Sequence, residues 1–232
     1  GTAASLLLQG CTIADNVSAS GHGGGVAIID ASPRYEDCIV SGNVAAGRGG
    51  GLFHQNANPE LLRCEIADNQ ATDVGGGMSN LTSGAQLESC TVSTNTAFRG
   101  AGIHQENSSV LLTDCEVSSN DAGDAGGGLY IDGSSSATLV GSDLWCNTPE
   151  AIVGSWNDGG TDGGGDNCVN EDCTACESCP GDVDGDGEVG GADLATILGW
   201  WGTDDDSADL NGDGEVNGAD LSFVLGYWGL CP

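Results

Sequence analysis

Two twelve-residue loops near the C-terminus carry the residues best suited to hold a metal ion. They run from Asp182 to Asp193 and from Asp209 to Asp220, and they start 27 residues apart. Each loop has oxygen-bearing side chains at positions 1, 3, 5 and 12, a glycine at position 6 and a valine at position 8. Oxygen ligands at this spacing suit Ca²⁺, and the glycine permits the sharp turn that wraps the chain around the ion. Because the pattern occurs twice in register, chance explains it poorly, and the sequence predicts calcium binding.

An apolar pattern follows each loop and predicts one short amphipathic helix there. Apolar residues recur at i, i+3, i+4 and i+7, which places them along one side of a helix. They are Leu194, Ile197, Leu198 and Trp201 after the first loop, and Leu221, Val224, Leu225 and Trp228 after the second. No helical pattern precedes either loop, since Cys179-Pro180-Gly181 stands before the first and an acidic run, 204–209, before the second. The element that positions each site is therefore a loop with an exit helix.

This duplicated loop and exit helix resembles the dockerin module of type I, over residues 180 to 232. The resemblance implies two calcium ions, a pseudo-twofold pair of helices, and docking onto a cohesin domain of a scaffold or cell-surface protein. It implies that the first ion is bound by the side chains of Asp182, Asp184, Asp186 and Asp193 and the backbone carbonyl of Glu188. The corresponding ligands of the second ion are Asp209, Asn211, Asp213 and Asp220, with the carbonyl of Glu215.

The chain departs from the dockerin pattern at the positions that recognise the partner. Family members usually carry a hydroxyl-bearing or similarly polar pair at loop positions 10 and 11. Here those positions hold Gly191-Ala192 and Gly218-Ala219. We therefore expect an unfamiliar partner. The alternative is that calcium only folds a small module and that no partner exists.

The overall charge excludes several classes of partner. The chain has 35 acidic residues against four arginines and no lysine, a net charge of −31, and neither lysine nor arginine occurs after Arg99. This balance argues against nucleic acid or an anionic membrane surface as a partner. The longest apolar stretches are far shorter than the roughly 20 residues of a membrane span, so no membrane insertion is expected. Eleven cysteines and calcium loops favour an extracellular, secreted or cell-surface protein.

Residues 1 to about 150 repeat every 25 to 27 residues. The most regular columns contain one cysteine and, five residues later, one asparagine in each repeat. The cysteines are Cys11, Cys38, Cys64, Cys90 and Cys115, and the asparagines are Asn16, Asn43, Asn69, Asn95 and Asn120; a sixth repeat has Ser142 and Asn147. An aliphatic residue follows each cysteine position by two, a leucine or tyrosine precedes it by three, and small-residue triplets recur at 23–25, 49–51, 75–77, 100–102 and 126–128.

These repeats predict a mainly β fold, a parallel β-helix of about six coils. Identical columns would stack about 4.8 Å apart along the axis, with asparagine at one bend and glycine at another. A solenoid of helices is the alternative, but Gly/Ser/Thr/Asn-rich repeats have little helix propensity. The pattern resembles the right-handed β-helix of pectate-lyase-like proteins, and its Gly-Gly-apolar…Asn element is similar to polymorphic outer-membrane protein repeats. Gly1 to Gly10 already has the pattern of a mid-coil, so we expect a longer solenoid.

We therefore predict three parts: β-helix repeats over 1–165, a Cys-rich linker over 166–179 and the small α-helical, dockerin-like domain over 180–232. The five column cysteines are expected to be free buried thiols, because an odd number of identical sites cannot all pair. The other six are expected in disulfides of underivable pairing, with a Cys179–Cys231 clasp as one attractive pair; zinc or an iron–sulfur cluster on Cys173, Cys176 and Cys179 is the alternative. These six are Cys146, Cys168, Cys173, Cys176, Cys179 and Cys231.

The solenoid shows no catalytic constellation. Its arginines (Arg34, Arg48, Arg63, Arg99) and acidic bend residues (Asp15, Asp68, Asp73) do not cluster, and no Ser/His/Asp, Walker or dinucleotide motif occurs. His54 and His104, each followed by glutamine, are expected to be isolated surface histidines two coils apart.

The function that the sequence favours is a secreted, calcium-binding modular protein. Its tail would attach to a cohesin-type or cell-surface partner, and its β-helix would face the extracellular space or a carbohydrate. One alternative is a polysaccharide lyase or glycoside hydrolase whose catalytic coils lie upstream. A second alternative is an adhesin-like surface protein. No catalytic residue and no organic cofactor are assigned.

Overall fold

The chain divides into two compact units, one of residues 1–159 and 167–175 and one of residues 160–166 and 176–232. The computed structural model describes residues 6–159, 167–170, 181–184, 188–203, 205, 207–211 and 214–230. Much of the predicted linker, 166–179, lies outside the described residues, so the predicted domain limits stay predictions. Each unit is described by itself.

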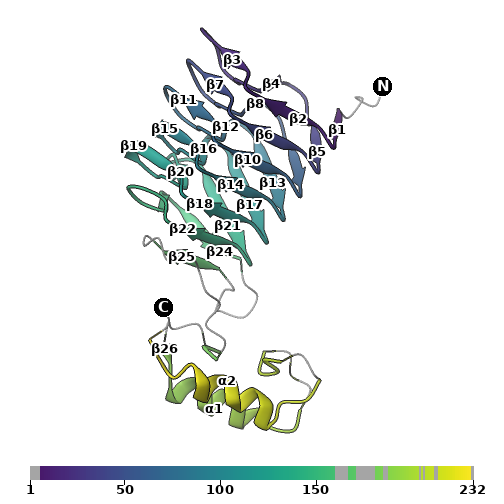
Figure 1. Cartoon of the computed structure of the whole chain (residues 1–232), viewed down its shortest axis with the longest axis vertical. Coiled ribbons are helices and arrows are strands. Elements are labelled where there is room, and N and C mark those ends of the chain that lie inside the picture. Colours follow the sequence, from purple (N-terminus) through teal and green to yellow (C-terminus); the bar gives the residue numbers. More distant parts are fainter. Residues whose placement is uncertain are drawn as a thin grey trace. The chain divides into compact units, whose positions relative to one another are not determined.

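The first unit is a parallel β-solenoid with four sheets (Figure 1). Each of the first five coils contributes one strand to each sheet in turn, and neighbouring strands pair in parallel. Sheet A contains β1 (Leu7–Gln9), β5 (Arg34–Glu36), β9 (Glu60–Leu62), β13 (Gly84–Glu88), β17 (Ser109–Thr113), β21 (Ser136–Val140) and β24 (Trp156–Asp158). Sheet B contains β2 (Thr12–Ala14), β6 (Ile39–Ser41), β10 (Glu65–Ala67), β14 (Thr91–Ser93), β18 (Glu116–Ser118), β22 (Asp143–Trp145) and β25 (Cys168–Asn170).

The other two sheets are shorter. Sheet C contains β3 (Val17–Ser18), β7 (Val44–Ala45), β11 (Gln70–Ala71), β15 (Thr96–Arg99) and β19 (Asp121–Ala125). Sheet D contains β4 (Val26–Ile29), β8 (Leu52–Gln55), β12 (Met78–Leu81), β16 (Ile103–Glu106), β20 (Leu129–Ile131) and β23 (Ile152–Val153). The predicted parallel β-helix is confirmed.

The interior of the solenoid consists of the predicted apolar columns. In sheet A, Tyr35 pairs in register with Leu61, and Leu61 with Leu87. In sheet B, Ile66 pairs with both Val40 and Val92. These side chains are at most 2% exposed. Residues that recur every 25 to 27 positions therefore form a continuous core, because each coil places an apolar side chain against the equivalent one in the next coil.

The asparagine column forms a hydrogen-bonded ladder at the bend between sheets B and C. The Nδ2 atom of Asn69 donates to Oδ1 of Asn95 at 3.0 Å and to the carbonyl of Val40 at 2.8 Å. The backbone N–H of Asn69 donates to the same Oδ1 at 3.0 Å. The equivalent bonds recur from Asn16 to Asn147. One residue type, asparagine, thus provides hydrogen-bond partners for the buried backbone groups of this bend.

The small-residue triplets lie at the second bend, between sheets C and D. The first glycine of a triplet has a positive φ, as at Gly75 with +69°. The next approaches the neighbouring coil, since a Cβ added to Gly76 would lie 2.5 Å from the Thr96 carbonyl oxygen. Glycine is therefore required at this bend both for its positive φ and for the close approach of the neighbouring backbone.

The column cysteines are free thiols, as predicted. Cys38, Cys64, Cys90 and Cys115 are buried, and Cys11 in the first coil is partly exposed. Ser142 continues the column, with its hydroxyl accepting a 3.0 Å hydrogen bond from the backbone N–H of Cys115. Cys146 and Cys168 are in the disulfide form. The remaining four cysteines lie outside the described residues, so the predicted pairings, including the Cys179–Cys231 clasp, stay predictions.

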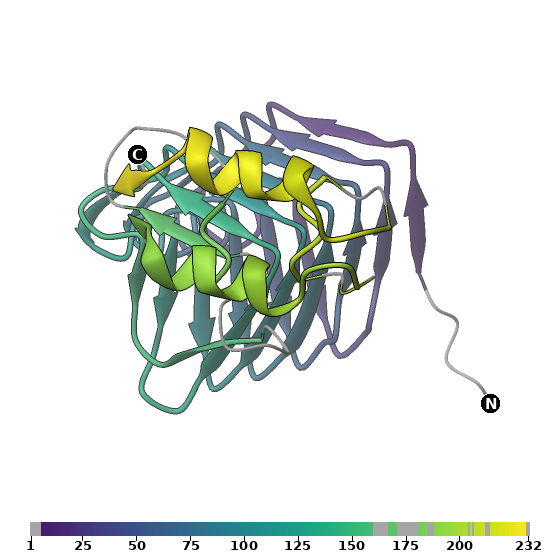
Figure 2. The same cartoon turned by 90° about the horizontal axis from the view of Figure 1, so that it is seen from below.

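The second unit contains two short helices, α1 (Gly191–Gly199) and α2 (Gly218–Gly226), which pack against each other (Figure 2). The strands β26 (Glu188–Val189) and β27 (Gly229–Leu230) form an antiparallel pair. The core of this unit consists of Val189, Ile197, Ala208, Val216 and Val224. Leu194 and Leu221 pack partly against it, whereas both helices end two residues before the tryptophans of the predicted apolar pattern.

Candidate metal centre

The first calcium loop brings three carboxylates together. One carboxylate oxygen from each of Asp182, Asp184 and Asp193 lies within 4.8 Å of the others. Asp193 is 1% exposed, whereas Asp182 is partly exposed and Asp184 is exposed. Oxygens at this separation suit a single Ca²⁺, which accepts six to eight oxygen ligands at 2.3–2.6 Å. Asp186 lies outside the described residues, and for Glu188 only the backbone is described, in β26.

Asp193 closes this loop and lies in the first turn of helix α1. Its Oδ1 accepts hydrogen bonds from the backbone N–H groups of Val183 at 2.7 Å and Asp184 at 3.1 Å. Its Oδ2 accepts from the N–H of Gly190 at 2.6 Å, at the N-terminus of the helix. The carboxylate at position 12 is therefore held by backbone N–H groups from the beginning of the loop and from the residue just before the helix.

The second loop repeats this arrangement. Oδ1 of Asp220 accepts from the N–H of Asn211 at 3.2 Å, and Oδ2 accepts from the N–H of Asn217 at 2.7 Å. Burial opposes ionisation of the Asp220 carboxyl, but hydrogen bonds from the backbone N–H groups of Asn217 and Asn211 outweigh it and lower its pKa. Asp220 is 0% exposed.

The turn of the second loop uses its glycine. The N–H of Gly214 donates to Oδ2 of Asp209 at 2.7 Å, which joins loop positions 6 and 1. Gly214 has φ +91°, a conformation that side chains other than glycine rarely adopt. Asp213 lies outside the described residues. In the described part of the second loop, hydrogen bonds thus join position 6 to position 1 and position 3 to position 12.

Both position-12 carboxylates are buried in a unit that contains no lysine, arginine or histidine among residues 176–232. Burying a carboxylate is costly unless hydrogen bonds or a cation compensate the charge. Backbone N–H groups supply part of the compensation. Since the unit has no basic side chain, only a cation from solution could add positive charge beside these carboxylates, and the oxygen donor set suits Ca²⁺.

Comparison with known families agrees with both units. A family model of the right-handed β-helix region matches residues 2–174, and a family model of the dockerin type I domain matches residues 180–227. The chain therefore belongs to the right-handed β-helix family and carries a dockerin type I domain near its C-terminus. No curated protein has a sequence that matches this chain.

The domain identity carries general consequences. Dockerin domains of type I bind calcium, and dockerins bind cohesins. Such modules occur in extracellular cellulosome proteins. Among the described residues, neither helix is long and apolar enough to cross a membrane.

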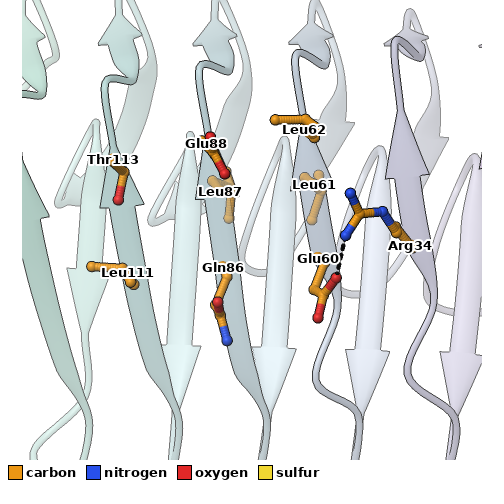
Figure 3. A pocket seen from close by; sticks show the side chains of 9 residues that line it. All are labelled: Arg34, Glu60, Leu61, Leu62, Gln86, Leu87, Glu88, Leu111 and Thr113. Atoms are coloured by element: carbon orange, nitrogen blue, oxygen red, sulfur yellow. Dashed lines mark hydrogen bonds and ion pairs between the residues drawn. The ribbon is translucent and has the colours of Figure 1, made fainter.

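A depression lies on the outer face of sheet A (Figure 3). It has a volume of about 260 Å³. It is lined by Arg34, Glu60, Leu61, Leu62, Gln86, Leu87, Glu88, Leu111 and Thr113. Arg34 is paired with Glu36 at 2.5 Å and Glu60 at 2.7 Å. The sequence did not predict this site, although six lining residues immediately precede or occupy the leucine column and thus recur with the repeat.

The expectation for the two histidines was wrong. His54 is 0% exposed and lies in the interior, where Nε2 is 3.1 Å from the Tyr35 hydroxyl and Nδ1 is 3.2 Å from Oδ1 of Asn80. His104 is 5% exposed and stacks on the ring of Tyr130 at 5.4 Å. Burial lowers the pKa of each to about 4.

The cause of this error is a one-residue difference in register. His54 pairs with Asn80, whereas His104 pairs with Ser79. Successive residues of a strand point to opposite faces, so the two histidines lie on opposite sides of sheet D. His54 follows its glycine triplet by three residues and His104 follows its triplet by two. The shared glutamine after each histidine concealed this difference.

All four arginines of the chain are paired with carboxylates. Besides Arg34, Arg63 contacts Asp37 at 2.7 Å, Arg99 contacts Asp124 at 2.5 Å, and Arg48 contacts Glu106 and Asp73. Asp15 and Asp68 lie at bends with positive φ, as expected for turn residues. The sequence predicted no set of catalytic residues, and we assign none among the described coils.

Proposed function

We propose that this chain is a secreted attachment protein whose dockerin domain binds two calcium ions and then docks onto a cohesin-type partner. The observation that carries the proposal is the first loop, where Asp182, Asp184 and Asp193 converge within 4.8 Å around a buried carboxylate that lacks a basic partner. The partner would be a scaffold or cell-surface protein. The β-helix would be the cargo that the partner holds outside the cell.

The ligands follow from loop position. Asp182, Asp184, Asp186 and Asp193 would bind the first ion by side chain, and Asp209, Asn211, Asp213 and Asp220 the second. The carbonyls of Glu188 and Glu215 would complete the two sets. A bound ion supplies the positive charge that draws each loop around its buried position-12 carboxylate. The repeated hydrogen bonds of Asp193 and Asp220 support one ion in each loop.

An extracellular location fits the charge and the cysteines. A net charge of −31 is tolerated best where divalent ions are abundant. The disulfide form of Cys146 and Cys168 fits an oxidising compartment. The thiols of the cysteine column are shielded by burial, so they need not pair.

A second candidate function belongs to the depression on sheet A. Glu60, Gln86, Glu88 and Thr113 offer hydrogen-bonding groups beside Leu62 and Leu111, a mixture that suits a polysaccharide. A lyase or glycoside hydrolase with catalytic coils upstream would use such a face to extend its binding groove. Because every arginine is paired with a carboxylate, these coils offer no unpaired arginine that could serve as the base. Docking is therefore the preferred function, and an adhesin-like surface role is the third option.

The test is a pull-down from the extracellular and envelope fraction of the source organism. The calcium-loaded chain is the bait, beside the same bait in chelator and a calcium-loaded Asp193→Asn, Asp220→Asn double variant. The proposal predicts recovery of a protein with a cohesin domain only by the first bait. Equal recovery by all three baits, or by none, contradicts it.

A further inference from the structure

The free cysteines of the solenoid form a column of thiols, one in each of five successive coils. They are Cys11, Cys38, Cys64, Cys90 and Cys115. The strands on both sides of this bend pair in register from coil to coil, so the column keeps the spacing of the coils, about 4.8 Å. Each inner thiol of the column therefore has one thiol in the coil before it and one in the coil after it.

The thiols of neighbouring coils lie close enough to interact. The backbone N–H of Cys64 donates a hydrogen bond to Sγ of Cys90 at 3.4 Å. A hydrogen bond from the Cys90 thiol lowers the pKa of Cys115, and the same hydrogen bond raises the pKa of Cys90 to about 11. Hydrogen bonds of this kind, to sulfur, stabilise a thiolate.

The fold of this bend does not require sulfur. Ser142 continues the column, and its hydroxyl accepts a 3.0 Å hydrogen bond from the N–H of Cys115 and donates to the carbonyl of Val140 at 3.1 Å. Each buried thiol of the column donates to the equivalent carbonyl, two residues before it, at 3.2–3.4 Å. Because serine makes the same hydrogen bonds as cysteine here, five successive thiols indicate a role for the chemistry of sulfur.

The thiol protons can leave without depriving a backbone group of its partner. The carbonyl of Leu62, which accepts from the Cys64 thiol, also accepts from the N–H of Asp37 at 3.0 Å. The carbonyl of Glu88 likewise accepts from the N–H of Arg63 at 3.0 Å. Deprotonation of the thiols therefore leaves these carbonyls hydrogen-bonded, so it carries no penalty for an unpaired buried acceptor.

The spacing of the column selects the kind of ligand. Two metal–sulfur bonds of about 2.3 Å, arranged in a line, span about 4.6 Å, which is close to the coil spacing of about 4.8 Å. Thiolates select soft cations such as Cu⁺, which accepts two ligands in a line. Among the described residues, the column does not gather three metal-binding side-chain atoms within 4.8 Å, so it lacks the four ligands of a Zn²⁺ site.

We infer that the thiol column binds Cu⁺, with each ion held in a line between the Sγ atoms of two neighbouring coils. Binding converts two thiols into two thiolates, forms two metal–sulfur bonds and releases two protons to solvent, while the metal keeps its oxidation state. Five thiols in a row contain two separate neighbouring pairs, so the column takes two ions. This site is independent of the calcium loops and of docking.

The experiment titrates the full, calcium-loaded chain with Cu⁺ under argon, in competition with a chromophoric Cu⁺ chelator of known affinity. Two double variants each keep three of the five thiols. Cys38→Ser with Cys90→Ser leaves no two thiols in neighbouring coils, and we call it the alternating variant. Cys11→Ser with Cys115→Ser leaves thiols in three successive coils, and we call it the end variant. Because Ser142 already occupies this column, serine should preserve the fold, which circular dichroism checks.

The number of ions bound should follow the number of neighbouring pairs and not the number of thiols. The other six cysteines are the same in every sample, so differences between samples report the column alone. We expect the parent chain to bind two more ions than the alternating variant, and the end variant to bind one more. Cys64→Ser leaves a pair on each side of the substitution and should bind as many ions as the parent chain.

Two results would overturn the inference. Equal uptake by the alternating and end variants would show that thiols in neighbouring coils are not needed. Because the column is buried, each chain is also refolded from urea in the presence of Cu⁺. Equal uptake by the parent chain and the alternating variant, both when folded and after refolding, would show that the thiols only pack the core.

Discussion

In the solenoid, the column residues of the inner coils have counterparts in both neighbouring coils, whereas the dockerin domain contains only two copies of its motif. Asn69 is held by Asn95 and in turn holds Asn43, so the bonds of one coil continue into the next. The dockerin domain has only five buried apolar side chains in its core and two buried carboxylates. One unit is therefore stabilised by stacking, and we expect the other to need an ion from solution.

Calcium removal should produce the largest difference in stability between the two units. In chelator we expect residues 181–230 to lose hydrogen-exchange protection almost completely, because a unit with so small a core depends on its ions to fold. The solenoid, residues 6–159, should keep its protection. Hydrogen exchange with mass spectrometry follows both units in one sample. Protection of the second unit that survives chelation would show that its ions are dispensable.

A methyl group at the second bend should damage the solenoid alone. In Gly76→Ala the new Cβ would lie 2.5 Å from the Thr96 carbonyl oxygen and 2.6 Å from that of Ala101. Both neighbours are backbone atoms, so we expect a loss of about 3 kcal/mol or more of unfolding free energy. Gly133→Ala, where nothing lies within 4 Å, is the control and should change it by less than about 0.5 kcal/mol. Urea unfolding followed by circular dichroism compares them.

Breaking the asparagine ladder tests stacking directly. Asn95→Ala removes the acceptor of the buried Asn69 backbone N–H, which would be left without a partner, and one of the two acceptors of the Asn69 side-chain amide. We expect a loss of about 3 kcal/mol. Asn58 is exposed and accepts a single 3.0 Å hydrogen bond from Gly84, so Asn58→Ala should cost less than about 1 kcal/mol. Similar losses for the two variants in urea unfolding would refute the ladder's importance.

Acid should weaken the solenoid through His54. Its folded-state pKa is about 4, below the usual 6.5, so the unfolded chain binds more protons between these values. Stability should therefore fall by about 2–3 kcal/mol as the pH drops from 6.5 to 4. Hydrogen exchange of solenoid peptides at several pH values measures this, and a His54→Gln variant should show a flatter profile. An identical profile would assign the acid sensitivity elsewhere.

Much of the solenoid structure could be predicted from the repeated columns of its sequence. The wrong prediction for the histidines came from a shift of one residue in register. Cys, Asn and Leu columns predicted the interior because a repeated residue marks a repeated position. The histidines were misplaced because a shared neighbour, Gln55 or Gln105, suggested one column, although distance from the glycine triplet assigned two. The depression on sheet A was also accessible to this reasoning, because Arg34, Glu60 and Gln86 recur 26 residues apart.

In the dockerin domain, the loops were predictable from spacing, but the exposed half of each helix was not. The periodicity that placed Ile197 in the core placed Leu198 beside it, on the same apolar side. Two short helices offer each other only one contact face, so Ile197 is buried and Leu198 remains exposed. Tertiary packing, and not the sequence pattern, decides which apolar residues are left for a partner.

The most direct test of the account is a calorimetric titration of the full, metal-free chain with calcium. We predict two ions per chain, one ion for Asp193→Asn, one for Asp220→Asn, and none for the double variant. A control substitution of the exposed Asp30 in the solenoid, Asp30→Asn, should still bind two. A parent chain that binds two ions unaffected by either loop variant would contradict the assignment of calcium to the dockerin loops.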